Sequence, residues 1–119
     1  MIVIPFQSNY TVNQGSTFNQ VYQLLDAYEL PFNLAAYTAR LQCRPFVDSD
    51  QVFFDLTTEN GGITITPSLG LISVDMDADQ TAALNFNMVA VYDLELYHGD
   101  IVQRFTFGNV TLSLEVTRP

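Results

Sequence analysis

Apolar and polar residues alternate with a period of two along most of this sequence of 119 residues. The pattern is clear in residues 37–43 and 88–97, and it is clearest in residues 109–117. In that last stretch the expected apolar face consists of Val110, Leu112, Leu114 and Val116. Because successive side chains of a strand point to opposite faces, the alternation predicts antiparallel strands with one face in a core and one in water.

Weaker alternation predicts further strands, at residues 16–25, 51–57, 63–66, 71–76 and 101–107. In the stretch 101–107 we expect Phe105 and Phe107 on one face and Thr106 on the other. The Gly108-Asn109 pair that follows is either a bulge inside one long strand or a turn between two strands.

Turn signals separate these runs at residues 60–62, 68–70 and 97–100, each of which contains glycine. Residues 77–84 have an acidic start and small helix formers, so we expect one short helix capped by Asp77. About eight short strands with regular turns predict an all-β fold, a two-sheet antiparallel β-sandwich of immunoglobulin-like type. A jelly roll or a small barrel is the runner-up.

The length fits one domain, which we assign to residues 11–119. The preceding segment, residues 1–10, is apolar and then polar around Pro5. It is either an arm that adds a strand to a neighbouring subunit or an ordinary first strand. An arm predicts that truncation of residues 1–10 leaves the fold intact.

The chain is strongly acidic, with four arginines, no lysine and a formal net charge of −9. Such a chain has no basic groove to neutralise nucleic-acid phosphates and no attraction to an anionic membrane surface. No apolar run approaches the roughly 20 residues of a membrane span. The single cysteine, Cys43, excludes an internal disulfide and a cysteine-rich zinc site.

Residues that often carry chemistry have plainer interpretations here. The run Asp75–Asp79 resembles the start of a calcium loop, but Gln80 and Phe86 occupy the positions that require Gly and Glu. We therefore interpret it as a strand end followed by an acidic helix start, and a different kind of cation site stays the alternative. His98 lies in a predicted turn without further ligands. We expect no enzymatic activity, no cofactor and no metal site.

Exposed aromatic residues and arginines indicate a protein interface instead. The arginines Arg40, Arg44 and Arg104 lie on strand faces, where they either pair with local carboxylates or contact a partner. Phe86 belongs with the aromatic residues that we expect at strand ends, in loops or away from the core. The candidate interface residues are Ile2, Ile4, Phe6, Tyr10, Tyr28, Phe32, Arg40, Arg44, Phe46, Phe53 and Tyr97.

Three stretches resemble small virion proteins of tailed bacteriophages. The first is Gly15-Ser16-Thr17-Phe18, and the second, residues 31–44, is similar to their P-x-D-L-T-G-Y-x-a-x-x-q-I-R segment. The third runs from Val91-Tyr92-Asp93-Leu94-Glu95-Leu96 through Arg104 and Gly108 to Glu115-Val116-Thr117-Arg118, which resembles their V-Y-D-l-e-i … E-V-T-R ending. The chain departs from the pattern at Asn33, Ala35 and Ala36, where the family has Asp, Thr and Gly.

The family also resembles the N-terminal domain of phage baseplate upper proteins, an immunoglobulin-like sandwich that docks receptor-binding parts onto the tail. The resemblance implies a non-enzymatic structural protein, an accessory or adaptor subunit of the tail, baseplate or fibre attachment. It implies other virion proteins as partners, a possible homo-oligomer, synthesis in the host cytoplasm and final location in the virion. A capsid decoration protein is the alternative, and a host-glycan-binding module ranks below it.

Overall fold

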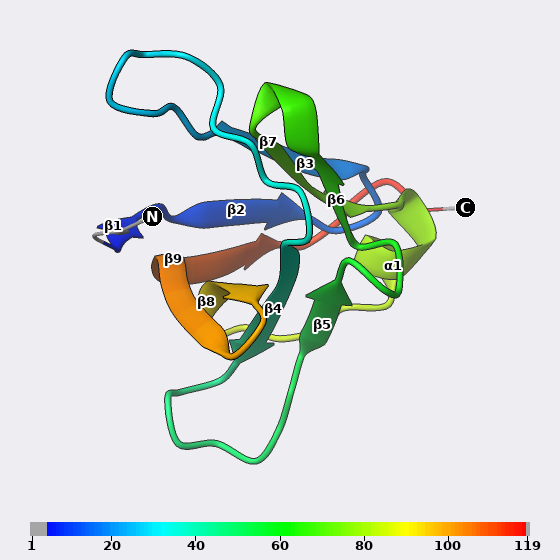
Figure 1. Cartoon of the computed structure of the whole chain (residues 1–119). Coiled ribbons are helices and arrows are strands. Elements are labelled where there is room, and N and C mark those ends of the chain that lie inside the picture. Colours follow the sequence, from blue (N-terminus) through cyan, green and yellow to red (C-terminus); the bar gives the residue numbers. More distant parts are fainter. Residues whose placement is uncertain (1–4, 119) are drawn as a thin grey trace.

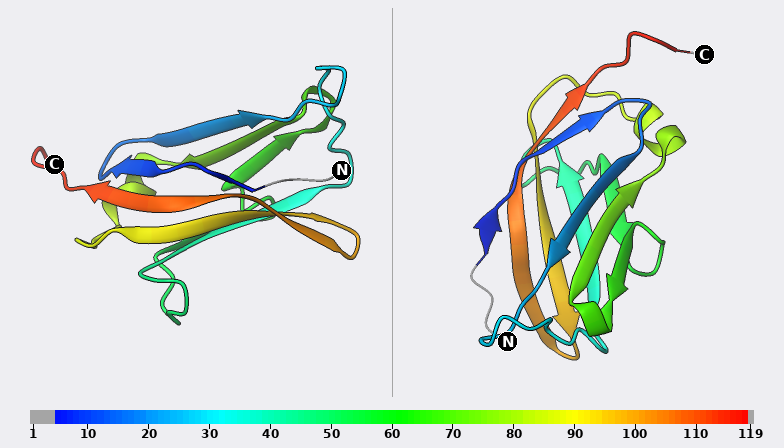
Figure 2. Two further views of the ribbon diagram at one scale, coloured as in Figure 1. Left: turned by 90° about the vertical axis from the view of Figure 1, so that its left-hand side faces the viewer. Right: turned by 90° about the horizontal axis from the view of Figure 1, so that it is seen from above.

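The strands of this protein form two sheets packed face to face, in a computed structural model that describes residues 5–118 (Figure 1). The large sheet contains β1 (Phe6–Gln7), β2 (Tyr10–Asn13), β4 (Thr38–Arg44), β5 (Phe54–Thr57), β8 (Ala90–His98) and β9 (Ile101–Ser113). The small sheet contains β3 (Phe18–Gln23), β6 (Ile63–Thr66) and β7 (Leu71–Met76). The prediction of a two-sheet, sandwich-like β protein is confirmed, and Figure 2 shows the two layers edge-on.

The prediction of a wholly antiparallel sandwich is wrong at one edge of the large sheet. There β1 and β2 both pair with β9 in parallel, with Phe6 opposite Thr106 and Tyr10 opposite Val110. The other strand pairs of the described residues are antiparallel, in the order β9-β8-β4-β5 and β3-β7-β6. Alternation reveals which side chains face the core, but it carries no information on the direction of the neighbouring strand.

The core lies between the sheets and follows the alternation in the central strands. Leu41 of β4 and Leu94 and Leu96 of β8 are buried, and they face Ile72 and Val74 of β7 across the sandwich. Each of these strands keeps polar or half-buried residues on its other side. The predicted inward faces of these three strands are confirmed.

Strand β9 departs from the predicted pattern because it contains a bulge. Leu94 pairs with Thr106 and Glu95 with Arg104, so that Phe105 is an extra residue on β9. Phe105 and Thr106 are consequently both buried, and Phe107 turns to the outer face. The predicted sharing of one face by Phe105 and Phe107 is wrong. Gly108-Asn109 lies inside one long strand, as one alternative proposed, but the bulge expected there is at Phe105 instead.

The predicted strand over residues 109–117 ends early, at Ser113. Leu114 is 54% exposed and Val116 is 90% exposed, so the expectation that both face the core is wrong. The reason is the neighbouring strand, since β2 ends at Asn13. Beyond it the Gln14 N–H donates to the Ser113 carbonyl, and the Gln14 side chain accepts a hydrogen bond from the Glu115 N–H. A strand that loses its partner loses its place over the core.

The predicted short helix is confirmed as α1 (Ala78–Ala82), which lies at one end of the sandwich (Figure 1). Asp77 accepts a hydrogen bond from the Gln80 N–H, and the Gln80 side chain accepts one from the Asp77 N–H, which forms a capping box. Thr81 is buried and its hydroxyl donates to the Ser16 carbonyl. These bonds close the end of the core. A single turn of 3-10 helix, η1 (Pro67–Leu69), joins β6 to β7.

The predicted boundary between the N-terminal segment, residues 1–10, and the domain, residues 11–119, falls inside β2. Tyr10 and Val12 are buried in the core, the Tyr10 hydroxyl hydrogen-bonds the Tyr22 hydroxyl, and the Tyr10 ring stacks on Tyr92. The described part of this segment is therefore a first strand of the sandwich. Removal of residues 1–10 would take the Tyr10 side chain out of the core, so from the structure we expect the truncated chain to be less stable, rather than to keep its fold intact.

Burial of weakly acidic groups predicts a loss of stability in alkali. Burial raises the pKa of Cys43 and of Tyr92 to about 12, and it raises the pKa of Tyr10 further. The folded state thus favours the neutral forms, and their stabilisation is complete below about pH 9 and is lost as the pH rises toward 12. We expect the free energy of unfolding to fall by a few kcal/mol by about pH 11, measured by urea titration at several pH values.

The matched variant for this experiment is Cys43→Ala, which removes one of the three groups. Its free energy of unfolding should fall less steeply with pH than that of the wild-type protein. Identical slopes would show that the Cys43 thiol ionises as easily in the folded protein as in the unfolded chain.

Candidate interaction surfaces

Three of the four arginines lie on the outer face of the large sheet. We call this surface the arginine face, and it comprises Arg40, Gln42, Arg44, Asp55, Asp93, Glu95 and Arg104. These residues face outward because their strand neighbours fill the core. The register places Arg40 opposite Glu95 and Glu95 opposite Arg104, so charges of opposite sign alternate across the strands.

The ion pairs of the arginine face are of unequal strength. Arg40 donates two hydrogen bonds to the carboxylate of Asp55, at 3.1 and 2.6 Å, and this guanidinium lowers the pKa of Asp55. Arg104 approaches the Asp93 carboxylate at 3.4 Å. Partial burial and the charge of Glu95 raise the pKa of Asp93, against the opposing effect of that arginine.

Arg44 is held by neutral groups. Its guanidinium donates to the Ser49 carbonyl at 2.7 Å and to the Gln42 side-chain oxygen at 2.8 Å. Among residues 5–118 the ion pairs within 4 Å are those of Arg40 and Arg104. The alternative of local pairing therefore applies to Arg40 and Arg104, and Arg44 keeps a positive charge that no described carboxylate contacts directly.

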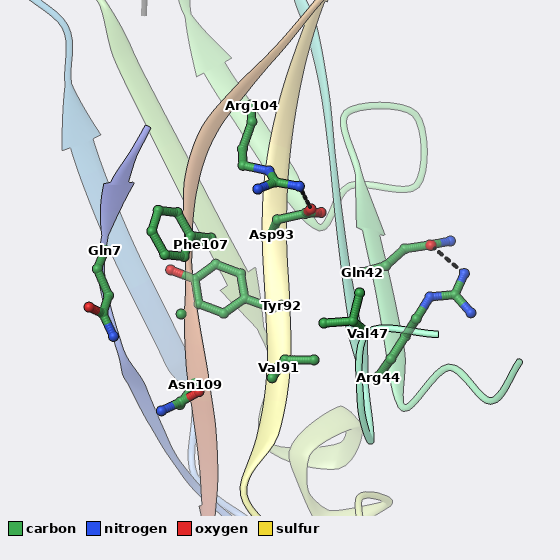
Figure 3. A pocket seen from close by; sticks show the side chains of 11 residues that line it. Gln7, Gln42, Arg44, Val47, Val91, Tyr92, Asp93, Arg104, Phe107 and Asn109 are labelled. Atoms are coloured by element: carbon green, nitrogen blue, oxygen red, sulfur yellow. Dashed lines mark hydrogen bonds and ion pairs between the residues drawn. The ribbon is translucent and has the colours of Figure 1, made fainter. Parts of the chain in front are cut away.

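A depression of about 310 Å³ lies across β4, β8 and β9 and includes Gln42, Arg44, Asp93 and Arg104 of the arginine face; we call it the sheet groove. Figure 3 shows Arg104 reaching Asp93 on one side of the groove, with Phe107, Val91 and Val47 around the rest. Val47 belongs to the loop between β4 and β5 and is 86% exposed. The groove thus combines an apolar lining with an ion pair, a combination suited to an apolar side chain that carries a neighbouring polar group.

A second surface gathers at one end of the sandwich, where the β3–β4 connection, η1 and the β8–β9 turn lie together (Figure 2). We call it the loop end, and its exposed apolar residues are Leu25, Tyr28, Leu30, Leu69, Ile101 and Val102. Tyr28, at the tip, is 84% exposed. The Asp26 carboxylate accepts hydrogen bonds from the N–H groups of Tyr28 and Leu30, which fixes the shape of the tip.

The loop end is tied to the sandwich on two sides. The Leu24 N–H donates to the Gly70 carbonyl at 2.8 Å, and the Leu34 N–H donates to the Pro67 carbonyl at 3.1 Å. On the other side the Tyr37 ring stacks on His98 with ring centres 4.6 Å apart. The loop that carries the apolar side chains at the tip is therefore fixed to the sandwich. Binding of a partner would cost little conformational entropy, because the loop is already ordered.

Gly70 and Gly99 provide a matched test of this attachment. Both have positive φ, +63° and +57°, but a Cβ at Gly70 would lie 2.5 Å from the Leu24 carbonyl oxygen, whereas a Cβ at Gly99 meets nothing within 4 Å. We expect Gly99→Ala to cost about 1 kcal/mol through backbone strain and Gly70→Ala to cost about 3 kcal/mol or more. Urea denaturation measures both, and equal costs would mean that the loop does not rest on the β6–β7 turn.

The structure distributes the candidate interface residues over different places. Tyr28 and Phe32 belong to the loop end, and Phe46 is exposed in the β4–β5 loop. Arg40 and Arg44 belong to the arginine face, and the Tyr97 hydroxyl donates to Glu95 at its edge. The Phe6 ring packs on Tyr22 and Phe105 at the β1 edge. Ile2 and Ile4 lie outside the described residues.

Two expectations of aromatic exposure are wrong. Tyr10 is 4% exposed, because its hydroxyl has a buried partner in Tyr22, and Phe86 is also buried. Phe53 is partly buried, and it stacks face to face on Phe86 with ring centres 4.2 Å apart. In the sequence a tyrosine next to polar residues is expected at the surface. A buried hydrogen-bond partner for its hydroxyl allows it to lie in the core instead, and the sequence pattern does not reveal that partner.

Residue patterns missed part of both surfaces. The missed residues are Leu25, Leu30, Val47, Leu69, Ile101, Val102 and Phe107. Leu30 precedes a proline and Val47 precedes an aspartate, and both neighbours are local signals for an exposed loop. Phe107 had no such signal, because its orientation depends on the bulge at Phe105.

The acidic run Asp75–Asp79 has local partners. Asp75 accepts hydrogen bonds from the Asn19 and Ser73 side chains, and Asp77 caps α1. The interpretation as a strand end followed by an acidic helix start is confirmed. Residues 5–118 contain no group of three or more His, Cys, Asp or Glu side chains that could hold a metal ion, and no helix among them is long and apolar enough to cross a membrane.

Comparisons with known proteins add no relatives to this description. No protein-family model matches the chain, and no curated protein matches its sequence.

Proposed function

We propose that this protein is a non-enzymatic structural subunit of a bacteriophage virion, an adaptor of the tail, baseplate or fibre attachment. The observation that carries the proposal is the loop end, a held group of exposed apolar side chains at one end of a β-sandwich. A monomeric surface rarely keeps such a group without a partner. The resemblance of three sequence stretches to small phage virion proteins supplies the assembly in which the partner lies.

The proposed fold within this class is immunoglobulin-like, and the strand order supports it. The small sheet β3-β7-β6 matches the order B-E-D, and the run β9-β8-β4-β5 matches the order G-F-C-C′ of variable-type domains. In this assignment β1 and β2 form the first strand, and the loop end contains the B–C and F–G loops, which are binding loops in variable domains.

The charge of the loop end defines the chemistry of the partner. Asp26, Glu29 and Asp100 lie in its loops, and all four arginines lie outside them. A complementary surface on a neighbouring virion protein would have an apolar socket for Tyr28 with lysine or arginine at its rim. Tyrosine suits this role, because its large rigid ring buries much area at a small cost in side-chain entropy.

The test is the copy number of the chain in purified particles of the phage that encodes it, measured by quantitative mass spectrometry against the major capsid protein. An adaptor predicts a small multiple of the rotational symmetry of the tail. A copy number comparable to that of the capsid subunit would indicate a capsid decoration protein instead of an adaptor. Absence from the particles would overturn the virion assignment.

A further inference from the structure

The arginine face differs in charge from the rest of the molecule. Its three arginines are balanced by three carboxylates, those of Asp55, Asp93 and Glu95, so the face is neutral. The net charge of −9 therefore resides on the remaining surface. Two copies of so acidic a chain repel each other in most orientations, and this face is where they can approach with the least repulsion.

The loop between β4 and β5 stands away from both sheets beside this face (Figures 1 and 2). Two exposed apolar residues, Phe46 and Val47, are followed by the exposed carboxylates of Asp48 and Asp50. We call these residues, 46–50, the knob. The knob thus presents apolar groups and negative charge side by side.

The sheet groove has the complementary composition. Val91 and Phe107 supply apolar lining, Arg104 is paired with the Asp93 carboxylate, and the guanidinium of Arg44 supplies the remaining positive charge. Arg44 is the arginine whose hydrogen bonds go to neutral acceptors, so it retains capacity for a carboxylate from outside. One chain therefore carries, on one face, both members of a matching pair.

From this complementarity we propose that two copies of the chain associate through their arginine faces, each covering the sheet groove of the other with its knob. A two-fold axis satisfies both contacts at once, since the knob of each copy meets the groove of its partner. The molecule measures 46 × 30 × 23 Å, so its broad side exceeds the roughly 800 Å² that each partner contributes to a standard interface. This contact goes beyond the proposed adaptor function, which uses the loop end.

Sedimentation velocity of the full chain, from low micromolar to millimolar concentration, tests the proposal. The wild-type protein should pass from monomer to dimer over this range. In Val47→Asp the dissociation constant should rise by roughly tenfold or more, because an added carboxylate on the knob is desolvated against the apolar groove. The matched control is Val116→Asp, the same substitution at a site that is 90% exposed and outside the arginine face, and it should leave the dissociation constant unchanged.

Two further variants separate the explanations. Phe46→Ala weakens the dimer without changing the charge, and Tyr28→Ala at the loop end leaves the dimer intact. A wild-type protein that stays monomeric throughout, or equal weakening by Val47→Asp and Val116→Asp, overturns the proposal. A dimer that is lost in Tyr28→Ala but not in Val47→Asp would place the second copy on the loop end, which also overturns it. None of these outcomes depends on the copy number in the virion.

Discussion

Leu94→Ala is expected to lower the free energy of unfolding by about 3 kcal/mol, whereas Leu114→Ala should change it by less than about 0.5 kcal/mol. Leu94 is fully buried in β8, at the centre of the large sheet, and its truncation leaves a cavity that the packed sheets cannot close. Leu114 lies beyond the end of β9 and is more than half exposed. The alternation pattern alone assigns both leucines to the core.

Urea denaturation followed by far-ultraviolet circular dichroism measures both variants under the same conditions. The pair is matched, because the same atoms are removed at both positions. Equal costs would mean that residues 114–117 continue the strand over the core, as the alternation predicts, and that the structure of this segment is different from the one described.

Tyr10→Ala should be the most damaging of the tyrosine substitutions, with a loss of about 4 kcal/mol, while Tyr28→Ala should cost less than about 0.5 kcal/mol. The Tyr10 side chain stacks on Tyr92, lies edge-on against Phe18 and hydrogen-bonds Tyr22, so its loss affects both sheets. Tyr28 projects from the loop end. A small domain with 5–15 kcal/mol of total stability loses a large fraction of it in the first case only.

The two variants should also separate by function. Under the proposed adaptor function, Tyr28→Ala should keep its unfolding midpoint but be incorporated poorly into virions. Tyr10→Ala should be missing from virions mainly because the protein unfolds. The measurement combines thermal denaturation with mass spectrometry of particles from phages carrying each variant. A Tyr10→Ala protein as stable as the wild type would restore the arm hypothesis for residues 1–10.

The central strands were predictable because their environment is uniform. In β4, β7 and β8 the alternation follows the buried face, since each strand is paired on both sides and covered by the opposite sheet. In β9 the pattern failed where the partner strands change. The bulge depends on the register against β8, and the end of the strand depends on where β2 stops. Both are long-range properties, which a local pattern does not contain.

The candidate surfaces were predictable in outline only. Arginines at alternating positions of a strand indicated an outward face, and Tyr28 and Phe46 lie in loops, so their placement followed from local features. Tyr10 could not be placed this way, because its burial depends on three rings from distant strands. Charge balance on the arginine face likewise emerges only when β4, β5, β8 and β9 are aligned.

The parallel pairing of the first and last strands has a mechanical consequence. β1, β2 and β9 run in the same direction, away from the loop end, and β9 leaves the sheet at the end opposite the loop end (Figure 2). A force that pulls the two ends of the chain apart therefore acts along the strands and strains the hydrogen bonds between β2 and β9 together, in shear. Bonds strained together resist more than bonds opened one after another. A subunit anchored at both ends would transmit tension along its long axis before it yielded.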